Sequence, residues 1–151
     1  MNRYKFRGRH EATKIWATGG VEVIESWNPR VSSDEDRAYI VNRGFRTAVE
    51  SQTIGQTTCF CDCDNEEIFD GDIVERTLFD NELQIEYVER FLVEYIKNDG
   101  KFIAKFIDNG FQQEIGSWLE RTKVIGNIHD TPQLLKQKTF NDISSAVKAV
   151  Q

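Results

Sequence analysis

The chain has 151 residues, a net charge of −6, 39% apolar residues and 29% charged residues, which is typical of one soluble globular domain. No apolar run approaches the roughly 20 residues that span a bilayer, and no apolar segment follows the basic N-terminus as in a secretory signal. The three cysteines lie in one stretch, which favours a reducing compartment over a disulfide framework. We therefore expect a cytoplasmic protein with no membrane partner.

The charge is distributed unevenly along the chain. Residues 62–90 hold eleven acidic residues and two arginines, whereas the first thirty residues hold six basic and three acidic ones. An acidic segment repels phosphate, so the net charge disfavours broad nucleic-acid binding. The basic N-terminal segment leaves a local nucleic-acid contact open.

The first half of the chain shows three short strand patterns and one ambiguous segment. Residues 3–9 alternate aromatic and basic side chains, which predicts a strand with one basic face. Residues 14–16 and 21–24 predict two further strands, separated by Gly19-Gly20. Residues 32–36 read as a polar connection. Residues 37–49 fit either a strand or a helix.

The second half shows clearer strand alternation. Apolar residues recur at every second position from Leu83 to Tyr87 and from Phe91 to Tyr95, with Glu86 and Glu94 between them. Asn98-Asp99-Gly100 then supplies residues that tolerate a positive φ, so we expect a hairpin and a return strand over 102–106. Asn109-Gly110 predicts the next turn, and a last short strand begins at Val124.

These patterns predict a mainly β (α+β) fold, either a small bent sheet or an SH3-like barrel, with one or two short helices. Thr131-Pro132 predicts one helix start, and residues 141–151 could form a second helix. We expect one domain over 1–135 and a C-terminal tail over 136–151. The predicted core residues are Phe69, Ile73, Val74, Phe91, Val93, Phe102, Phe106, Val124 and Ile125.

Four stretches resemble the YopX family of phage and prophage proteins. They are Tyr4-Lys5-Phe6-Arg7, Thr53-Ile54-Gly55-Gln56, the segment from Glu67 to Val74, and the segment from Val124 to Asp130. Their order and spacing also fit the family, over roughly residues 1–135. The resemblance implies a phage-encoded cytoplasmic protein of unknown biochemical role that forms oligomers, and it brings no catalytic residues.

Asp70-Gly71-Asp72 is the most distinctive part of these stretches. Glycine can adopt a left-handed conformation, and aspartate side chains can accept hydrogen bonds from turn amides. Because Ile73 and Val74 begin a strand, we interpret the motif as a structural turn with Gly71 at a positive φ. A metal or ligand site is the less favoured alternative.

The three cysteines, Cys59, Cys61 and Cys63, recur at every second residue, which would place them on one side of a strand. Three thiolates with His10 or His129 could hold a soft metal, and a metal-dependent enzyme is therefore a remote alternative. A second ligand pair is missing from the sequence, and family members have a different turn here. We expect no metal, no cofactor and no catalytic residues, although a Cys61–His129 dyad stays open.

The strip Arg3, Lys5, Arg7 and Arg9 is the candidate nucleic-acid contact, because a basic face beside aromatic residues could bind single strands. Alternation places the aromatic residues on the opposite face, so the strip reads more simply as a solvated edge strand whose charges prevent aggregation. The sequence therefore favours a non-enzymatic accessory protein that acts by binding or self-assembly. We expect a homo-oligomer with an unidentified protein partner, and a nucleic-acid-binding module is the alternative.

Overall fold

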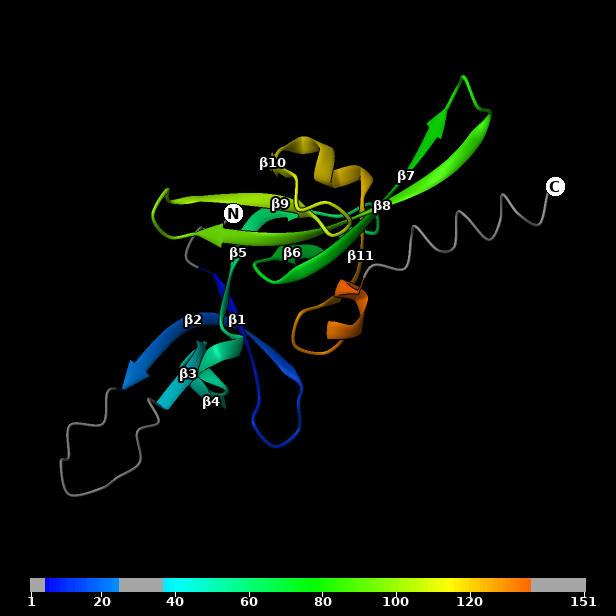
Figure 1. Ribbon diagram of the computed structural model, residues 1–151. Coiled ribbons are helices and arrows are strands. Elements are labelled where there is room, and N and C mark those ends of the chain that lie inside the picture. The colour runs from blue at the N-terminus through cyan, green and yellow to red at the C-terminus, as the bar shows by residue number, and fades with distance from the viewer. Residues whose placement is uncertain (1–4, 25–36, 137–151) are drawn as a thin grey trace. The chain divides into compact units, whose positions relative to one another are not determined.

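The computed structural model describes residues 5–24 and 37–136. The chain divides into two compact units, Met1–Cys59 and Phe60–Gln151. Both units consist of antiparallel strands and short 3₁₀ turns (Figure 1). The predicted mainly β fold is therefore confirmed. The two sheets are open along the described residues, because each strand order has two ends, so the SH3-like barrel is not what forms there.

The N-terminal unit is a meander with one added strand. It contains β1 (Phe6–Arg9), β2 (Trp16–Ile24), β3 (Arg37–Asn42), β4 (Phe45–Val49), the 3₁₀ helix η1 (Ser51–Thr53) and the beginning of β5 (Gly55–Cys61). The strands lie in the order β4-β3-β2-β1-β5 of a six-stranded sheet that ends in β6 (Glu67–Phe69), and the boundary between the two units falls inside β5.

Three expectations about this unit change. The basic strand β1 is not an edge strand, because it pairs with β2 on one side and with β5 on the other. Gly19-Gly20 does not separate two strands but lies inside β2, whose Gly19 pairs with Phe6 of β1. The ambiguous segment 37–49 forms the β3–β4 hairpin around a turn with positive φ at Arg43 and Gly44. Residues 32–36 lie outside the described part of the chain.

The core of this unit is small. Ala38, Ile40 and Val49 are buried, and Phe6 packs against them from β1. A Cβ atom on Gly8 would lie 2.8 Å from Val49 Cγ2. Glycine at this position therefore lets β1 lie directly against the core residues.

The C-terminal unit holds the second sheet. Its elements are β6 (Glu67–Phe69), β7 (Asp72–Asp80), β8 (Ile85–Ile96), β9 (Lys101–Phe106), β10 (Gln112–Glu114), the 3₁₀ helix η2 (Ser117–Arg121), β11 (Lys123–Asn127) and the 3₁₀ helix η3 (Pro132–Leu135). Five of these strands form the sheet β10-β9-β8-β7-β11.

The predicted alternation decides which residues this unit buries. β8 and β9 form the expected hairpin across Asn98-Asp99-Gly100, in the register Phe91↔Phe106 and Val93↔Ala104. Val74, Phe91 and Val93 are fully buried, while Phe102, Phe106 and Val124 pack against them partly exposed. Most of the predicted core is therefore confirmed in this unit.

Ile125 is the predicted core residue that lies at an irregularity of the sheet. The pairing of β11 with β7 shifts register between Val124 and Gly126, so Ile125 occupies a β-bulge and is only half-buried. The predicted helix after Thr131 forms as η3, with Pro132 in its first turn. Residues 141–151 lie outside the described part of the chain. No helix among residues 5–24 and 37–136 is long and apolar enough to cross a membrane.

Candidate functional site

Asp70, Gly71 and Asp72 form the turn between β6 and β7. Gly71 has a φ of +90°, as expected from the sequence. Asp70 Oδ1 accepts a hydrogen bond of 3.0 Å from the Tyr95 amide, and Asp72 Oδ2 accepts one of 2.8 Å from the Phe69 amide. The two carboxylates thus bind backbone amides of their own unit, which is the arrangement expected of a structural turn.

Asp62 is a second buried carboxylate, and the sequence did not single it out. It is 5% exposed and directly follows β5. Its Oδ1 accepts 2.9 Å hydrogen bonds from the amides of Asp64 and Glu66, and its Oδ2 accepts one of 2.9 Å from the Val124 amide. Asp62 therefore shapes the turn before β6 and ties it to β11 from far along the chain.

The three cysteines do not share one strand face. Cys59 has a φ of +65°, which interrupts the alternation of β5, and Cys63 lies beyond the last residue of that strand. Within the described residues, no three metal-ligating side chains gather into a cluster that could hold a metal ion. The expected absence of a metal stays a prediction.

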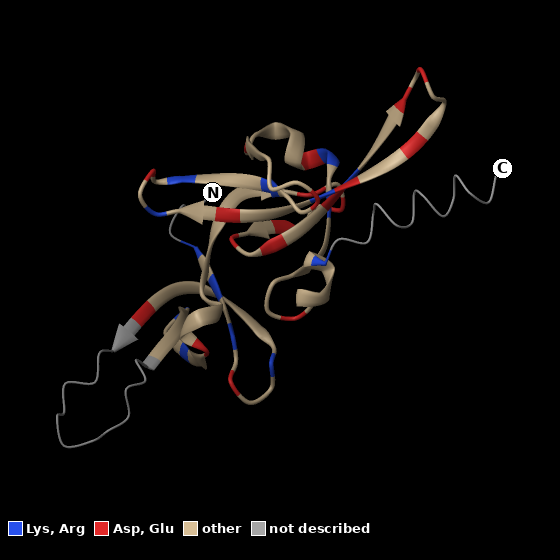
Figure 2. Ribbon diagram, in the orientation of Figure 1, with Lys and Arg blue, Asp and Glu red and all other residues tan. Residues whose placement is uncertain are grey.

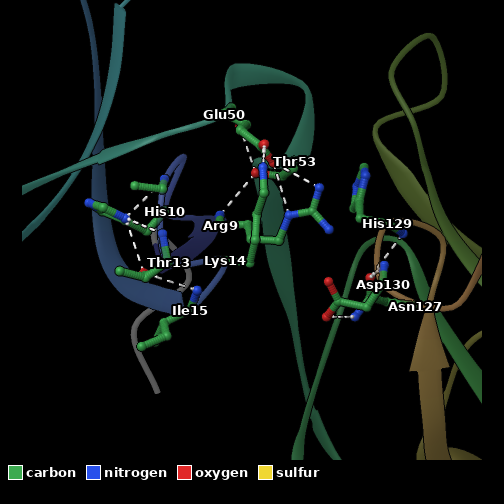
Figure 3. Close-up of polar contacts among 11 residues, drawn as sticks. Arg9, His10, Thr13, Lys14, Ile15, Glu50, Thr53, Asn127, His129 and Asp130 are labelled. Carbon is green, nitrogen blue, oxygen red and sulfur yellow. Dashed lines mark hydrogen bonds and ion pairs between the residues drawn. The ribbon is translucent and has the colours of Figure 1, made fainter.

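The two histidines each belong to a turn. His10 Nδ1 accepts hydrogen bonds from the amides of Ala12 and Thr13, at 3.3 and 3.1 Å (Figure 3). The His129 amide donates to Asn127 Oδ1 at 2.9 Å, and Asn127 also receives the Asp130 amide. Both contacts organise loops, as Asx-type turns do. Neither contact brings the imidazole to a cysteine thiol.

The basic strip of β1 is engaged within the N-terminal unit. Arg7 is 9% exposed and stacks over Trp16, with its guanidinium 4.5 Å from the ring centroid. Arg9 binds Glu50 through an ion pair of 2.8 Å, and Lys14 contacts the same carboxylate (Figure 3). Hydrogen bonds from Lys14 and Arg9 lower the pKa of the Glu50 carboxyl below its usual value.

The prediction that the charges of β1 are solvated is therefore wrong for Arg7 and Arg9. Lys5 is half-buried at the start of the unit, and Arg3 lies outside the described residues. Nucleic-acid binding by the strip stays a prediction, with fewer accessible charges than the alternation suggested.

The distal halves of β7 and β8 form a surface that the sequence did not identify. β11 pairs with β7 only over 72–75, and β9 pairs with β8 only over 91–96. Residues 76–80 and 85–89 therefore pair with each other and with no further described strand. This two-stranded ribbon with its turn, residues 76–89, is called the β7–β8 arm, and Figure 1 shows it extending beyond the rest of the sheet in green.

The arm carries large apolar side chains in contact with solvent. The exposed fractions are 51% for Phe79, 66% for Leu83, 48% for Ile85, 36% for Tyr87 and 37% for Val88. One face of the arm continues the buried face of the sheet, because the pair Leu78↔Tyr87 lies four pairs, an even number, beyond Val74↔Phe91. Phe79 and Val88 lie on the other face, so apolar side chains are exposed on both.

Arg76 and Glu89 mark where the covered core ends and the arm begins. They form a cross-strand ion pair of 2.5 Å, and the Arg76 guanidinium lies 5.1 Å from the Phe91 ring and 5.0 Å from the Trp118 ring. The ion pair therefore lies between the buried core residues and the exposed part of the arm. Beyond it, residues 77–88 contain Asp80, Glu82 and Glu86 and no basic residue, which Figure 2 shows as red bands without blue.

A signal for the arm was present in the sequence. The return strand after Asn98-Asp99-Gly100 is bounded by Asn109-Gly110, so it is too short to cover both alternating segments before the turn. Only the segment from Phe91 onward has a partner in β9. The alternation from Leu83 to Tyr87 predicted a strand correctly but not the exposure of its apolar residues.

The N-terminal unit also ends in an exposed strand. β4 is the last strand of its sheet, and its Phe45 is 77% exposed. Arg43 lies in the β3–β4 turn, and Arg46 is 54% exposed, where it pairs with Glu22 at 2.5 Å. Residues 38–49 contain these two arginines and no acidic residue. This strand and its turn, residues 43–47, are called the β4 edge.

Comparison with known families gives one match. The sequence model of a family described as YopX protein matches residues 5–136. A search of curated proteins gave no match. The matched range includes the turn at Gly71, the buried Asp62, the β7–β8 arm and the β4 edge.

Proposed function

The chain belongs to the YopX family, and we propose that it is a phage or prophage accessory protein that acts by self-assembly in the cytoplasm of its bacterial host. The resemblance stated above supports the phage origin and the compartment. Support for self-assembly comes from the β7–β8 arm. The proposal assigns no enzymatic activity; the carboxylates of Asp62, Asp70 and Asp72 accept hydrogen bonds from backbone amides, as structural carboxylates do.

The single observation that carries the proposal is the isolation of the arm. A two-stranded ribbon is marginally stable by itself in water, and its two outer edges present unpaired backbone donors and acceptors. Here the ribbon also exposes aromatic and aliphatic side chains on both faces. A contiguous exposed patch of this kind marks an interaction surface. A partner on the arm would cover the apolar side chains and complete the backbone hydrogen bonding.

The occupant that we propose is a second copy of this chain. The part of the arm beyond the Arg76–Glu89 ion pair, residues 77–88, is called the distal arm. It has three carboxylates and no basic side chain, so its charge favours a partner surface with basic residues. Such a surface is present on the chain itself, in the N-terminal unit around Arg43 and Arg46. Two arms, in contrast, would place like charges against each other and are not expected to pair.

Sedimentation of the purified protein over a range of concentrations tests the proposal. The wild type should increase in weight-average mass with concentration, and the double variant Phe79→Ser/Tyr87→Ser should remain monomeric. Both side chains are exposed, so the variant should keep the wild-type circular dichroism spectrum. Phe111→Ser is the matched control, since Phe111 is 66% exposed in the same unit but outside the arm. A wild type that stays monomeric at every concentration would overturn the proposal, and a double variant that assembles as the wild type does would overturn the role of the arm in it.

A further inference from the structure

We propose that the β7–β8 arm of one copy adds to the β4 edge of the next copy, which gives a head-to-tail contact. The inference rests on the proposed self-assembly and names the surface that receives the arm. It follows from three properties of the two surfaces: their open strand edges, their charges and their exposed aromatic side chains.

Both surfaces present an open strand edge of similar length. β4 is five residues long and terminates its sheet. The side away from β3 carries one isolated bridge, from Val49 to His10, so residues 45–48 have no described strand partner on that side. The β7 side of the arm, Arg76–Asp80, is also five residues long and lies beyond the end of the β7–β11 pairing. Addition of one strand to the edge of another sheet supplies main-chain hydrogen bonds without rearranging either partner.

The charges of the two surfaces are opposite. The distal arm carries Asp80, Glu82 and Glu86, whereas the β4 edge carries Arg43 and Arg46. Glu22 already pairs with Arg46, so Arg43 in the exposed turn is the arginine that an approaching carboxylate would meet first. Opposite charges at the rim favour this pairing over contact between two arms or between two β4 edges, and they make it sensitive to salt.

The apolar side chains are placed alike on both surfaces. Phe45 lies on the same side of β4 as the buried Val49, four residues away, yet it is 77% exposed. Tyr87 likewise lies on the same face of the arm as the buried Phe91. Each surface therefore extends the apolar face of its own core into solvent, and their contact would bury aromatic rings from both.

The contact joins two different surfaces, so its geometry differs from that of a symmetric dimer. A heterologous contact repeats from copy to copy and forms a ring or an open filament, whereas an isologous contact stops at two copies. A copy with a defective arm can still receive an arm at β4. A copy with a defective β4 edge can still donate its own arm.

A mixing experiment uses this asymmetry. The arm variant is Phe79→Ser/Tyr87→Ser and the edge variant is Arg43→Glu/Phe45→Ser, both prepared as full chains. Each variant alone should sediment as a monomer, with association at least about tenfold weaker than in the wild type. An equimolar mixture should reach the mass of a dimer and no more, because only one competent contact remains. The dimer should dissociate as the salt concentration rises.

The outcomes separate this inference from the proposed function. If the edge variant assembles as the wild type does, the arm docks on another surface of a second copy, and the inference fails while self-assembly stands. A mixture that stays monomeric also overturns the inference. If the arm variant alone assembles as the wild type does, assembly does not use the arm and the inference fails. If the wild type stays monomeric at every concentration, the proposed function fails as well. Circular dichroism spectra and melting temperatures of both variants check that each remains folded.

Discussion

Single residues in this protein mainly define turns. Gly71 combines a φ of +90° with two backbone contacts, since its amide donates to the Val93 carbonyl at 2.7 Å and its carbonyl accepts from Ile128 at 3.0 Å. The carboxylates on either side of Gly71 bind amides of neighbouring strands. Asp70-Gly71-Asp72, the most distinctive motif of the sequence, therefore starts β7 and holds it against β8.

Gly71→Val should destabilise the C-terminal unit by at least about 1 kcal/mol, because a β-branched residue is strained at a positive φ. Denaturant unfolding followed by circular dichroism measures the change. Gly20→Val is the matched control, since Gly20 lies in β2 and the nearest atom to its added Cβ would be Val41 O at 3.8 Å. Equal stability of Gly71→Val and the wild type would contradict the structural role of this turn.

At the scale of elements, the buried Asp62 joins segments that are distant in sequence. Its three amide contacts hold the turn before β6 and the beginning of β11. Asp62→Ala should cost about 2–4 kcal/mol, because three backbone amides lose a charged acceptor that is itself buried. Asp64→Ala should change stability by less than about 0.5 kcal/mol, since the Asp64 side chain is 64% exposed and lies 3.9 Å from Lys123.

Thermal unfolding of the two variants compares these effects directly. The melting temperature should drop clearly in Asp62→Ala and should hardly change in Asp64→Ala. Similar melting temperatures for both variants would show that the Asp62 contacts contribute little.

The sequence predicted elements best where a turn signal lay between two alternating segments. The β8–β9 hairpin and its core residues follow from Phe91, Val93 and Asn98-Asp99-Gly100, because local chemistry decides both the turn and the buried face. The position of β1 inside its sheet did not follow, since its two neighbours are set by pairing with β2 and β5. Alternation reports which side of a strand is buried, but not which strands lie beside it.

The exposed surfaces were harder still to predict for the same physical reason. Alternation from Leu83 to Tyr87 is the same whether a neighbouring strand covers the apolar side chains or not. Only the short pairing of β9 and β11 leaves the distal halves of β7 and β8 uncovered. Asp62 was missed because a buried carboxylate that binds distant amides leaves no local pattern.

For the molecule as a whole, function is expected to depend on contacts between copies. The N-terminal unit contributes an exposed basic strand edge, and the C-terminal unit contributes an acidic arm with exposed aromatic residues. The internal contacts of Arg7 and Arg9 leave the basic strip of β1 less suited to bind a partner than its sequence suggested. The assembly interpretation therefore depends on whether the arm is covered when copies meet.

Hydrogen–deuterium exchange at low and high protein concentration tests this claim most directly. In the dilute protein, amides of residues 76–80 and 85–89 should exchange faster than those of 72–75 and 91–96, because they belong to a ribbon with uncovered faces. At high concentration the arm should become protected, while the central sheet should exchange as before. Exchange in the arm that is the same at both concentrations, in a protein whose mass increases, would contradict the account.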